Sequence, residues 1–514
     1  MSRNGWTLVA VVLGSAIVFL DSTIVNVALK AIGEQLPTSV VGVLEGESYV
    51  VNGYLLTVSA LLILSGALAD AYGRRRLFII GLIGFGASSV LCGLAPTMEL
   101  LIAGRLVQGI FGAFLVPSSL AIITATFDGP ERGRAFGIWA AASSATTVLG
   151  PPVGGFLVDT FSWRIAFLMN VPLVVLAVVI AMRWVAESRN ELAPTRFDWL
   201  GATAVALAVG GLAFGAIRGQ QQNWTDPVAW AALVIGAVAT VALAPLMILR
   251  RDPLIPPQLF RSRNFTTTNI STFLIYGALY VVFGYQALFL QGTLSYSALA
   301  SGLAGMPISL GLAFLSTTFG HLAGKRGPRW YMAVGPALMA AGLLWLTRIP
   351  SSSTPWHARI EAPASLIPSS GYLLDVLPAM LVFAIGISIL VAPLTTALMG
   401  SVPARNSGLA SAINNAISRI GPLLAGAVIF IGVSASFYAA LHARVPTLDT
   451  SSAAVRAAIP PLNPPGPGLP AEQVAAAREA STDAYRLAML IAAALCAAGA
   501  VTNAVGIRNR PSVD

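Results

Sequence analysis

Two ionisable side chains within long apolar segments are the first candidates for chemistry. Asp21 lies in the apolar segment 6–29, and Arg105 lies in the apolar segment 99–126. At about 1.5 Å per residue, Asp21 is roughly 13 Å and Arg105 roughly 9 Å from the outer ends of their segments, so the two can meet. Charges in hydrocarbon are costly and usually functional, and the proton affinity of a buried carboxylate depends on neighbouring charge. The pair is therefore expected either to bind and release protons, with Arg105 tuning Asp21, or to be a structural ion pair.

Other polar residues in apolar segments could line a substrate cavity. Gln108 is at i+3 from Arg105 and could hold its guanidinium. Arg419 lies roughly 18 Å into the segment 407–437, with Asn415 one turn earlier. It is expected to bind Asn415 and backbone carbonyls, or else water or an anionic group of a substrate. We expect Asn26 to form a hydrogen bond between helices rather than to contact a ligand.

Aromatic residues of the segment 265–291 could add a wall to this cavity. Tyr276, Tyr280 and Phe283 share one helical face, and Gln286 follows them. Such a face suits a bulky amphipathic substrate, although it would equally suit contact with lipid.

The 3 histidines and 2 cysteines are scattered, so we expect no metal site and no cofactor.

The elements that must position these residues are membrane helices. Of the 514 residues, 56% are hydrophobic and only 10% are charged. A soluble domain carries about 25% charged residues, and segments of about 20 apolar residues are long enough to span a bilayer. The net charge of +9 comes from short groups between apolar segments, so nucleic-acid binding is not expected. The composition predicts an all-α polytopic membrane protein.

Fourteen membrane-spanning helices are expected. Their ranges are 6–29, 49–69, 77–95, 99–126, 134–157, 163–184, 199–217, 228–249, 265–291, 297–323, 330–348, 375–399, 407–437 and 484–507. With both termini inside the cell, 19 of the 30 basic residues face the cytoplasm, as the positive-inside rule requires. We therefore expect a multi-pass protein of the inner (plasma) membrane, with residues 349–374 and 442–483 as outside loops that act as spacers.

An internal repeat divides the chain into two halves. The stretch GALADAYGRRR at 66–76 has a partial copy at 320–329, and LGPPVGG at 149–155 matches IGPLLAG at 420–426. Duplicated bundles are typical of secondary transporters, whose binding site lies between the halves. We expect a six-helix bundle at 1–184, a linker with two inserted helices at 185–264, and a second six-helix bundle at 265–514.

Five motifs in order resemble one family. They are LDSTIVNVAL (20–29), GALADAYGRRR (66–76), RLVQGIFGA (105–113), LGPPVGG (149–155) and SWRIAFLMNVP (162–172). The chain resembles the major facilitator superfamily, in its fourteen-helix drug:proton antiporter branch of the quaternary-ammonium or multidrug exporter type. Lys30 and Tyr49 depart from the usual motifs of the first and second helices. The resemblance therefore extends to the fold but not to the outer mouth. Gly324 replaces the acid in the second copy of the loop motif.

The resemblance implies roles for two groups of residues. The first group would form a gate latch that holds the halves together on the cytoplasmic side, and consists of Gly66, Asp70, Gly73, Arg74 and Arg75. The second group would form the hinge or seal of the antiporter motif, and consists of Gly150, Pro151, Pro152, Gly154 and Gly155. A tight turn with topogenic arginines is the alternative for the first, and a packing kink is the alternative for the second.

The expected function follows from these features together. It is proton-coupled antiport that exports lipophilic, possibly cationic, drugs by alternating access, in a protein that is not an enzyme. The expected partners are a small lipophilic substrate, protons and membrane lipid, and the chain is expected to be a monomer. Export or flipping of an anionic amphiphile or lipid is the alternative within transport, and a membrane receptor on the same fold is the alternative outside it.

Overall fold

The computed structural model describes residues 2–37, 43–189, 197–221, 226–359, 362–466 and 468–509, and the regular structure of these residues is helical. The first bundle contains α1 (Arg3–Gln35), α2 (Val43–Tyr72), α3 (Arg74–Gly93), α4 (Met98–Thr126), α5 (Gly129–Thr160), α6 (Trp163–Leu168) and α7 (Asn170–Trp184). The helices α8 (Trp199–Gln221), α9 (Pro227–Leu249) and α10 (Gln258–Arg261) follow. The second bundle contains α11 (Arg263–Leu288), α12 (Ala298–Ala304), α13 (Met306–Arg326), α14 (Arg329–Leu346), α15 (Leu377–Met399), α16 (Ser407–Arg444), α17 (Ala453–Ala458) and α18 (Ala471–Gly506).

All fourteen expected segments are helical, but the expected number of spans is not supported. Twelve helices of the described chain are long and apolar enough to cross a membrane. The segments expected at 134–157 and 330–348 form α5 and α14, which are not among the twelve. The physical reason is composition: α5 carries Glu131, two arginines and many Gly, Ser, Thr and Pro residues, and the 18-residue α14 contains Arg329 and Pro336.

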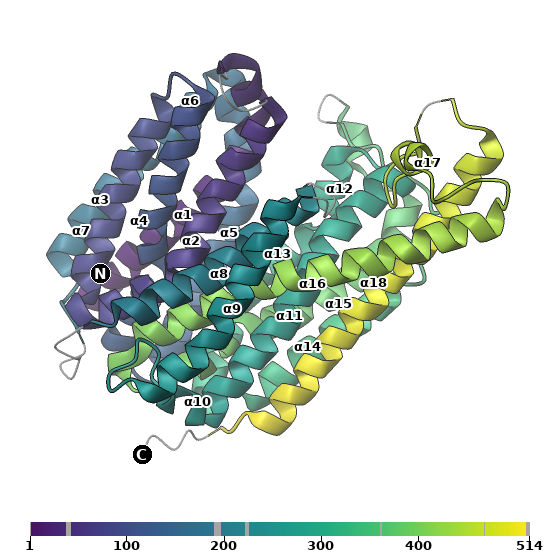
Figure 1. Cartoon of the computed structure of the whole chain (residues 1–514). Helices are drawn as coiled ribbons and strands as arrows, with labels where there is room; N and C mark the ends of the chain where they lie inside the picture. The colour runs from purple at the N-terminus through teal and green to yellow at the C-terminus, as the bar shows by residue number, and fades with distance from the viewer. Residues whose placement is uncertain are drawn as a thin grey trace.

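The two bundles lie side by side, with α8 and α9 packed beside them (Figure 1). The hairpin of α8 and α9 contacts the first bundle through α2 and the second through α16. Between the bundles, α2 packs against α16 and α5 packs against α13. These four helices form the main part of the interface between the halves, with further contacts of α4 with α16 and of α5 with α15.

Two close approaches between the halves lie at equivalent places. A Cβ added to Gly408 of α16 would lie 2.8 Å from the carbonyl oxygen of Gly66 of α2. A Cβ added to Gly320 of α13 would lie 2.6 Å from the carbonyl oxygen of Gly133 of α5. Both approaches are near the turns at 73 and 327, so the halves are joined at the end of the molecule that carries these turns, which we call the turn end. Residues without a Cβ allow the backbones to come this close.

The two long loops are more than spacers, because they pack on the second bundle. Trp356 of the first loop is 5% exposed, and Ile459 and Leu462 of the second are each 1% exposed. The Ser353 hydroxyl donates to Asp375 at 2.6 Å, and the Leu462 amide donates to the Ser481 hydroxyl at 3.2 Å. Burial of apolar side chains therefore fixes both loops over the end of the second bundle opposite the turn end.

Candidate functional site

The ionisable pair expected from the sequence is in contact inside the first bundle. Asp21 of α1 is 0% exposed and Arg105 of α4 is 1% exposed. Arg105 Nη1 lies 2.6 Å from Asp21 Oδ2. The side chains of α1 and α4 thus meet at one depth, as helix geometry led us to expect. A buried pair of this kind is costly to break, since removal of either partner leaves an uncompensated charge.

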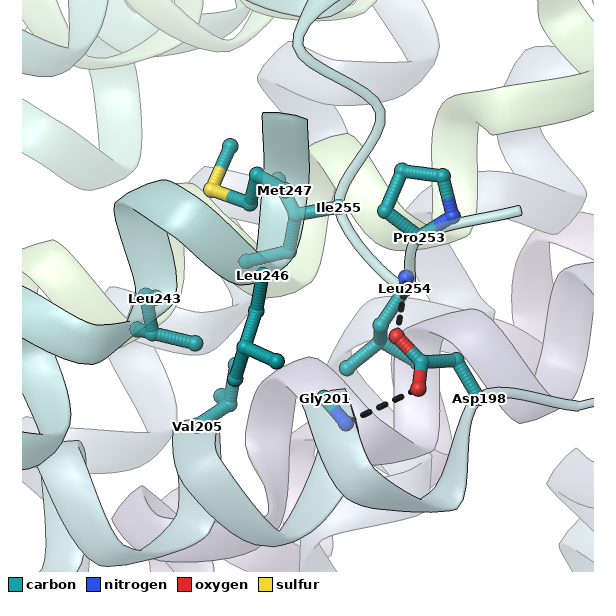
Figure 2. A pocket seen from close by; sticks show the side chains of 9 residues that line it. All are labelled: Asp198, Gly201, Val205, Leu243, Leu246, Met247, Pro253, Leu254 and Ile255. Carbon is teal, nitrogen blue, oxygen red and sulfur yellow. Dashed lines mark hydrogen bonds between the residues drawn. The ribbon is translucent and has the colours of Figure 1, made fainter. Parts of the chain in front are cut away.

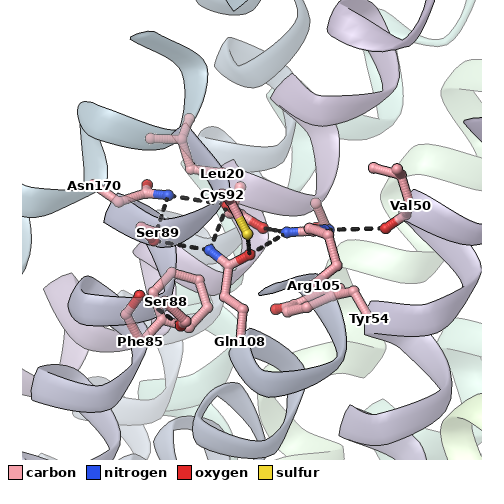
Figure 3. A network of polar contacts seen from close by, with 12 residues as sticks. Leu20, Val50, Tyr54, Phe85, Ser88, Ser89, Cys92, Arg105, Gln108 and Asn170 are labelled. Atoms are coloured by element: carbon pink, nitrogen blue, oxygen red, sulfur yellow. Dashed lines mark hydrogen bonds and ion pairs between the residues drawn. The ribbon is translucent and has the colours of Figure 1, made fainter. Parts of the chain in front are cut away.

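Two amide side chains, those of Gln108 and Asn170, complete the surroundings of Asp21. Figure 3 labels both amides together with Arg105 and Ser89. Gln108 Nε2 donates to Asp21 Oδ1 at 3.1 Å, and Asn170 Nδ2 donates to the same oxygen at 2.9 Å. Ser89 of α3 accepts from both amides, at 2.8 Å from Gln108 and 3.4 Å from Asn170. The carboxylate is therefore held by donors from α4 and α7, with α3 supporting the two amides.

Arg105 is fixed by groups other than the carboxylate. Its Nε donates to the carbonyl oxygen of Val50 at 3.0 Å, and its Nη1 donates to Gln108 Oε1 at 2.5 Å. Its guanidinium carbon lies 4.2 Å from the ring centre of Tyr54 and 5.7 Å from that of Phe167, within the range of cation–π attraction. The orientation of the guanidinium therefore does not depend on Asp21 alone.

Sequence reasoning identified Asp21, Arg105 and Gln108, but it missed Asn170 and Ser89. Asn170 is within the motif SWRIAFLMNVP and begins α7 directly after Met169, where α6 and α7 are separate helices. A polar residue at a break in an apolar segment was the signal that could have identified it. Ser89 gave no such signal, because serines in apolar helices commonly bond to their own backbone.

The expected latch residue Asp70 joins the two halves. Asp70 Oδ1 accepts from the Gly408 amide at 3.1 Å, and Oδ2 accepts from the Leu409 amide at 2.8 Å. Arg74 forms an ion pair with Asp70 at 2.8 Å and also donates to the carbonyl oxygen of Ala404. Asp70 is 5% exposed and Arg74 is 2% exposed. The carboxylate therefore caps the first turn of α16 from the opposite half, where a negative charge stabilises a helix.

The other arginines and the glycine turn of the latch have local partners. Gly73 has a φ of 113°, which favours glycine. The amides of Arg75 and Arg76 each donate to Glu187 at 3.1 Å. In the second half the Arg329 amide donates to Asn509 at 3.1 Å. Residues that follow α7 and α18 thus cap α3 and α14 in the same way, which supports the duplication of the halves.

The antiporter motif packs α5 against α1. A Cβ on Gly150 would lie 2.7 Å from Thr23 Cβ, and one on Gly154 would lie 3.2 Å from Ile24 Cα. A Cβ on Gly155 would meet only Val27, at 3.9 Å. The side chains of Pro151 and Pro152 are outside the described residues. Two of the three glycines therefore set the distance between α1 and α5.

The remaining residues expected in a substrate cavity have varied surroundings. Asn26 is exposed and donates to the carbonyl oxygen of Ser22 at 2.9 Å, within its own helix, rather than to another helix. Phe283 is 54% exposed, as a lipid-facing residue would be, and Tyr276 is half-buried. Gln286 is 7% exposed and lies 3.3 Å from the Met380 sulfur. The side chain of Tyr280 is outside the described residues.

Arg419 differs from expectation in its partners. Asn415 donates to the carbonyl oxygen of Ser411 at 2.9 Å, and it does not hold Arg419. The physical reason is local, because the carbonyl four residues earlier is the acceptor that a helical side chain reaches most readily. Arg419 is half-buried and donates no hydrogen bond to the described residues, although its charge acts on Tyr54.

A small pocket lies on elements that carry none of the predicted site residues (Figure 2). It is lined by Leu243, Leu246 and Met247 of α9, Val205 of α8 and the segment 253–255. Asp198 accepts from the Gly201 amide at 2.9 Å and from the Leu254 amide at 3.0 Å. The carboxylate thus caps α8 and anchors the connection after α9, which is a structural arrangement.

Comparison with known proteins gives a consistent result. A profile described as Major Facilitator Superfamily matches residues 11–426. The chain is 32% identical over 505 residues to the multidrug resistance protein Stp of Mycobacterium tuberculosis, covering 96% of this chain and 90% of that protein. It is 32% identical over 435 residues to the puromycin resistance protein pur8 of Streptomyces alboniger, covering 83% and 81%. The structure of the proton:xylose symporter XylE bound to 6-bromo-6-deoxy-D-glucose shares its fold, with a TM-score of 0.56 at 16% identity over 97% of this chain and 95% of that chain.

Proposed function

Because the chain belongs to the major facilitator superfamily of membrane transporters, we propose that it is a proton-coupled antiporter that exports lipophilic drugs. Members of this superfamily are generally not enzymes. The relatives named above are a multidrug resistance protein and a puromycin resistance protein. Their names speak of resistance to drugs, and this supports drugs as the substrates of this chain.

One observation carries the proton-coupling part of the proposal. Asp21 is a fully buried acid that contacts a permanent charge, Arg105, at 2.6 Å. Protonation of Asp21 leaves the guanidinium without its counter-charge, and this changes the balance of charge within the first bundle. A change of this size can favour another arrangement of the two halves. Proton uptake from one side and release to the other would then drive substrate in the opposite direction.

Alternating access needs an interface that opens and closes. The contact of Asp70 with the amides of Gly408 and Leu409 would hold the turn end closed in the present conformation.

We propose that the turn end is cytoplasmic and that both termini are cytoplasmic. We also propose that α5 and α14 cross the membrane, giving the fourteen-helix branch, because α5 packs along α1 and α13, and α14 packs along α15 and α18.

Transport in proteoliposomes under an imposed pH gradient tests the proposal. We expect the wild type to accumulate a lipophilic substrate against its gradient only while the pH gradient lasts. Asp21→Asn should lose uphill transport but remain folded and inserted, because Arg105 keeps its hydrogen bonds to the Val50 carbonyl and to Gln108. Asp449→Asn is the matched control, because Asp449 is exposed in the second long loop. Uphill transport by Asp21→Asn with normal pH dependence would contradict the proposal.

A second candidate function is export of an anionic amphiphile or lipid, and Arg419 favours it. A half-buried guanidinium without a hydrogen-bond partner among the described residues is costly within the membrane. An anionic group of a substrate would supply the missing partner. Cationic substrates of the quaternary-ammonium type would instead meet a like charge there.

The same vesicles distinguish the two candidates when cationic, neutral and anionic amphiphiles are compared. If the anionic class is transported, Arg419→Ala should abolish its transport and Arg419→Lys should retain part of it. If cations are transported and Arg419→Ala leaves their rates unchanged, the second candidate is wrong.

A further inference from the structure

Asn170 is held differently from the other amide that contacts Asp21. Both ends of the Gln108 side chain are engaged, because Oε1 accepts from Arg105 at 2.5 Å while Nε2 donates to Asp21 and Ser89. Asn170 is engaged at one end only. Its Nδ2 donates to Asp21 and Ser89, whereas its Oδ1 is buried without a hydrogen-bond partner among the described residues. A buried carbonyl oxygen without a donor is uncommon and requires an explanation.

The free end of Asn170 leaves the orientation of its amide dependent on Asp21. The oxygen and nitrogen of an asparagine amide exchange places by a half turn about χ2, a torsion with a broad energy profile. Ser89 accepts either orientation, because a hydroxyl both donates and accepts. Asp21 does not, because an ionised carboxylate only accepts, whereas a protonated carboxyl group also donates.

We propose that Asn170 is a positioning residue that follows the protonation state of Asp21 by turning its amide. With Asp21 ionised, Nδ2 donates to Oδ1 of the carboxylate, as in the structure. When a proton from water binds Asp21 Oδ1, the new O–H donates to Asn170 Oδ1, which has turned into the place of Nδ2. The Ser89 hydroxyl then donates to the same oxygen. This inference rests on the proposed role of Asp21 and adds a second residue to it.

The other groups around Asp21 do not offer the new proton an equivalent acceptor. Arg105 of α4 is the charged group in contact with it, and a guanidinium only donates. Two other titratable groups, Tyr54 of α2 and Cys92 of α3, interact electrostatically with Asp21. Among the described residues, α5, α6 and α7 place no charged side chain in hydrogen-bond contact with Asp21. Asn170 is therefore the neighbour best able to serve both protonation states without movement of the backbone.

The pH profile of transport tests this role. Asn170→Leu keeps the branching of the side chain but removes a donor to the ionised carboxylate and an acceptor for the protonated carboxyl group. The hydrogen bond to the charged form is the stronger of the two, so the ionised form loses more stabilisation. We expect the midpoint of the pH profile to move upward by about one pH unit. Asn170→Gln retains an amide and should restore part of the shift.

Asn503 provides a matched control in the second bundle. It is 0% exposed, and its Nδ2 donates to Ser271 at 2.7 Å and to the Met332 carbonyl at 2.8 Å. Its Oδ1 also lacks a hydrogen-bond partner within the described part of the chain. A purely structural loss should therefore be alike in Asn503→Leu and Asn170→Leu. If the midpoint of Asn170→Leu equals that of wild type, and only the rate falls as it does in Asn503→Leu, the inference is wrong.

A measurement on the wild-type protein covers the case in which Asn170→Leu fails to fold. Infrared difference spectra between high and low pH, with asparagine labelled by 13C at the side-chain carbonyl, should show an amide band that titrates together with the carboxyl band of Asp21. Asp21→Asn should remove both bands. A carboxyl band that titrates without any asparagine band would overturn the inference. Bands that titrate together in a protein without pH-driven transport would instead contradict the proposed function alone.

Discussion

Gly66 and Gly408 bring the two halves of the molecule into direct backbone contact. A Cβ on Gly408 would lie 2.8 Å from the Gly66 carbonyl oxygen, and one on Gly66 would lie 2.5 Å from Ala412 Cβ. Asp70 lies one turn after Gly66 and binds the amide of the same Gly408 at 3.1 Å. The close approach of the backbones is therefore what allows the carboxylate to reach the first turn of α16.

Enlarging Gly66 should open the turn end. Gly66→Leu would force α2 away from α16, because overpacking a close contact costs about 1–3 kcal/mol. We expect faster labelling of Ala412→Cys by a water-soluble thiol reagent and slower transport. Gly432→Leu, also on α16, is the control, since a Cβ at Gly432 would meet nothing within 4 Å. Equal labelling in the two variants would rule out a gating contact at Gly66.

Removing the charge of Asp70 should have a related effect without a change in size. Asp70→Asn retains the shape of the side chain but leaves Arg74 buried and unpaired, which typically costs about 3–5 kcal/mol. We expect a lower melting temperature and a larger population with the turn end open, measured by the same labelling of Ala412→Cys. Arg76→Ala is the control, because Arg76 is exposed and its backbone amide, which donates to Glu187, is retained. A normal labelling rate in Asp70→Asn would show that the carboxylate does not hold the halves together.

An acidic residue outside the membrane should give a pH-dependent contribution to stability. Asp226 precedes α9, and its pKa is held below the ordinary value by the Val228 amide and by Arg218. A lowered pKa in the folded state stabilises the protein above the unfolded value of about 3.9, and this stabilisation is lost as the pH falls through the folded value. The melting temperature of wild type should exceed that of Asp226→Asn at pH 7, and the difference should shrink below about pH 4. A constant difference across this range would contradict the assignment.

Residues whose partners are set by helix geometry could be predicted from the sequence. The depths of Asp21 and Arg105 along their helices placed them at one level, and the resemblance implied that the two helices face each other there. For Asp70, the resemblance implied a contact that holds the halves together, and in the structure Asp70 contacts Arg74 and the first turn of α16. The identity of that helix end could not be predicted, because Asp70 and Gly408 are 338 positions apart and only the packing of the two bundles joins them.

The hydrogen-bond partners of Asn170 and Asn415 could not be predicted from the sequence. Asn170 contacts Asp21 from the first turn of α7, and the periodicity of its apolar segment did not distinguish it from its neighbours. Asn415 was expected to hold Arg419, but the Ser411 carbonyl within the same helix competes successfully. Fourteen spans were expected, whereas twelve helices of the described chain are long and apolar enough, since the Gly, Pro and charged residues of α5 and α14 lower their hydropathy.

The contact between α5 and α1 provides a final test in which one change should compensate another. Gly150→Ala would place a methyl group 2.7 Å from Thr23 Cβ, whereas Gly155→Ala would meet only Val27 at 3.9 Å. We expect Gly150→Ala to destabilise the protein by about 1–3 kcal/mol and to slow transport, and we expect Gly155→Ala to behave like wild type. Because Thr23 is the residue in the way, Thr23→Gly should restore much of the loss in the double variant, measured by melting temperature and by transport. If Gly150→Ala is harmful but Thr23→Gly gives no recovery, the harm arises from the backbone of α5 and not from its distance to α1.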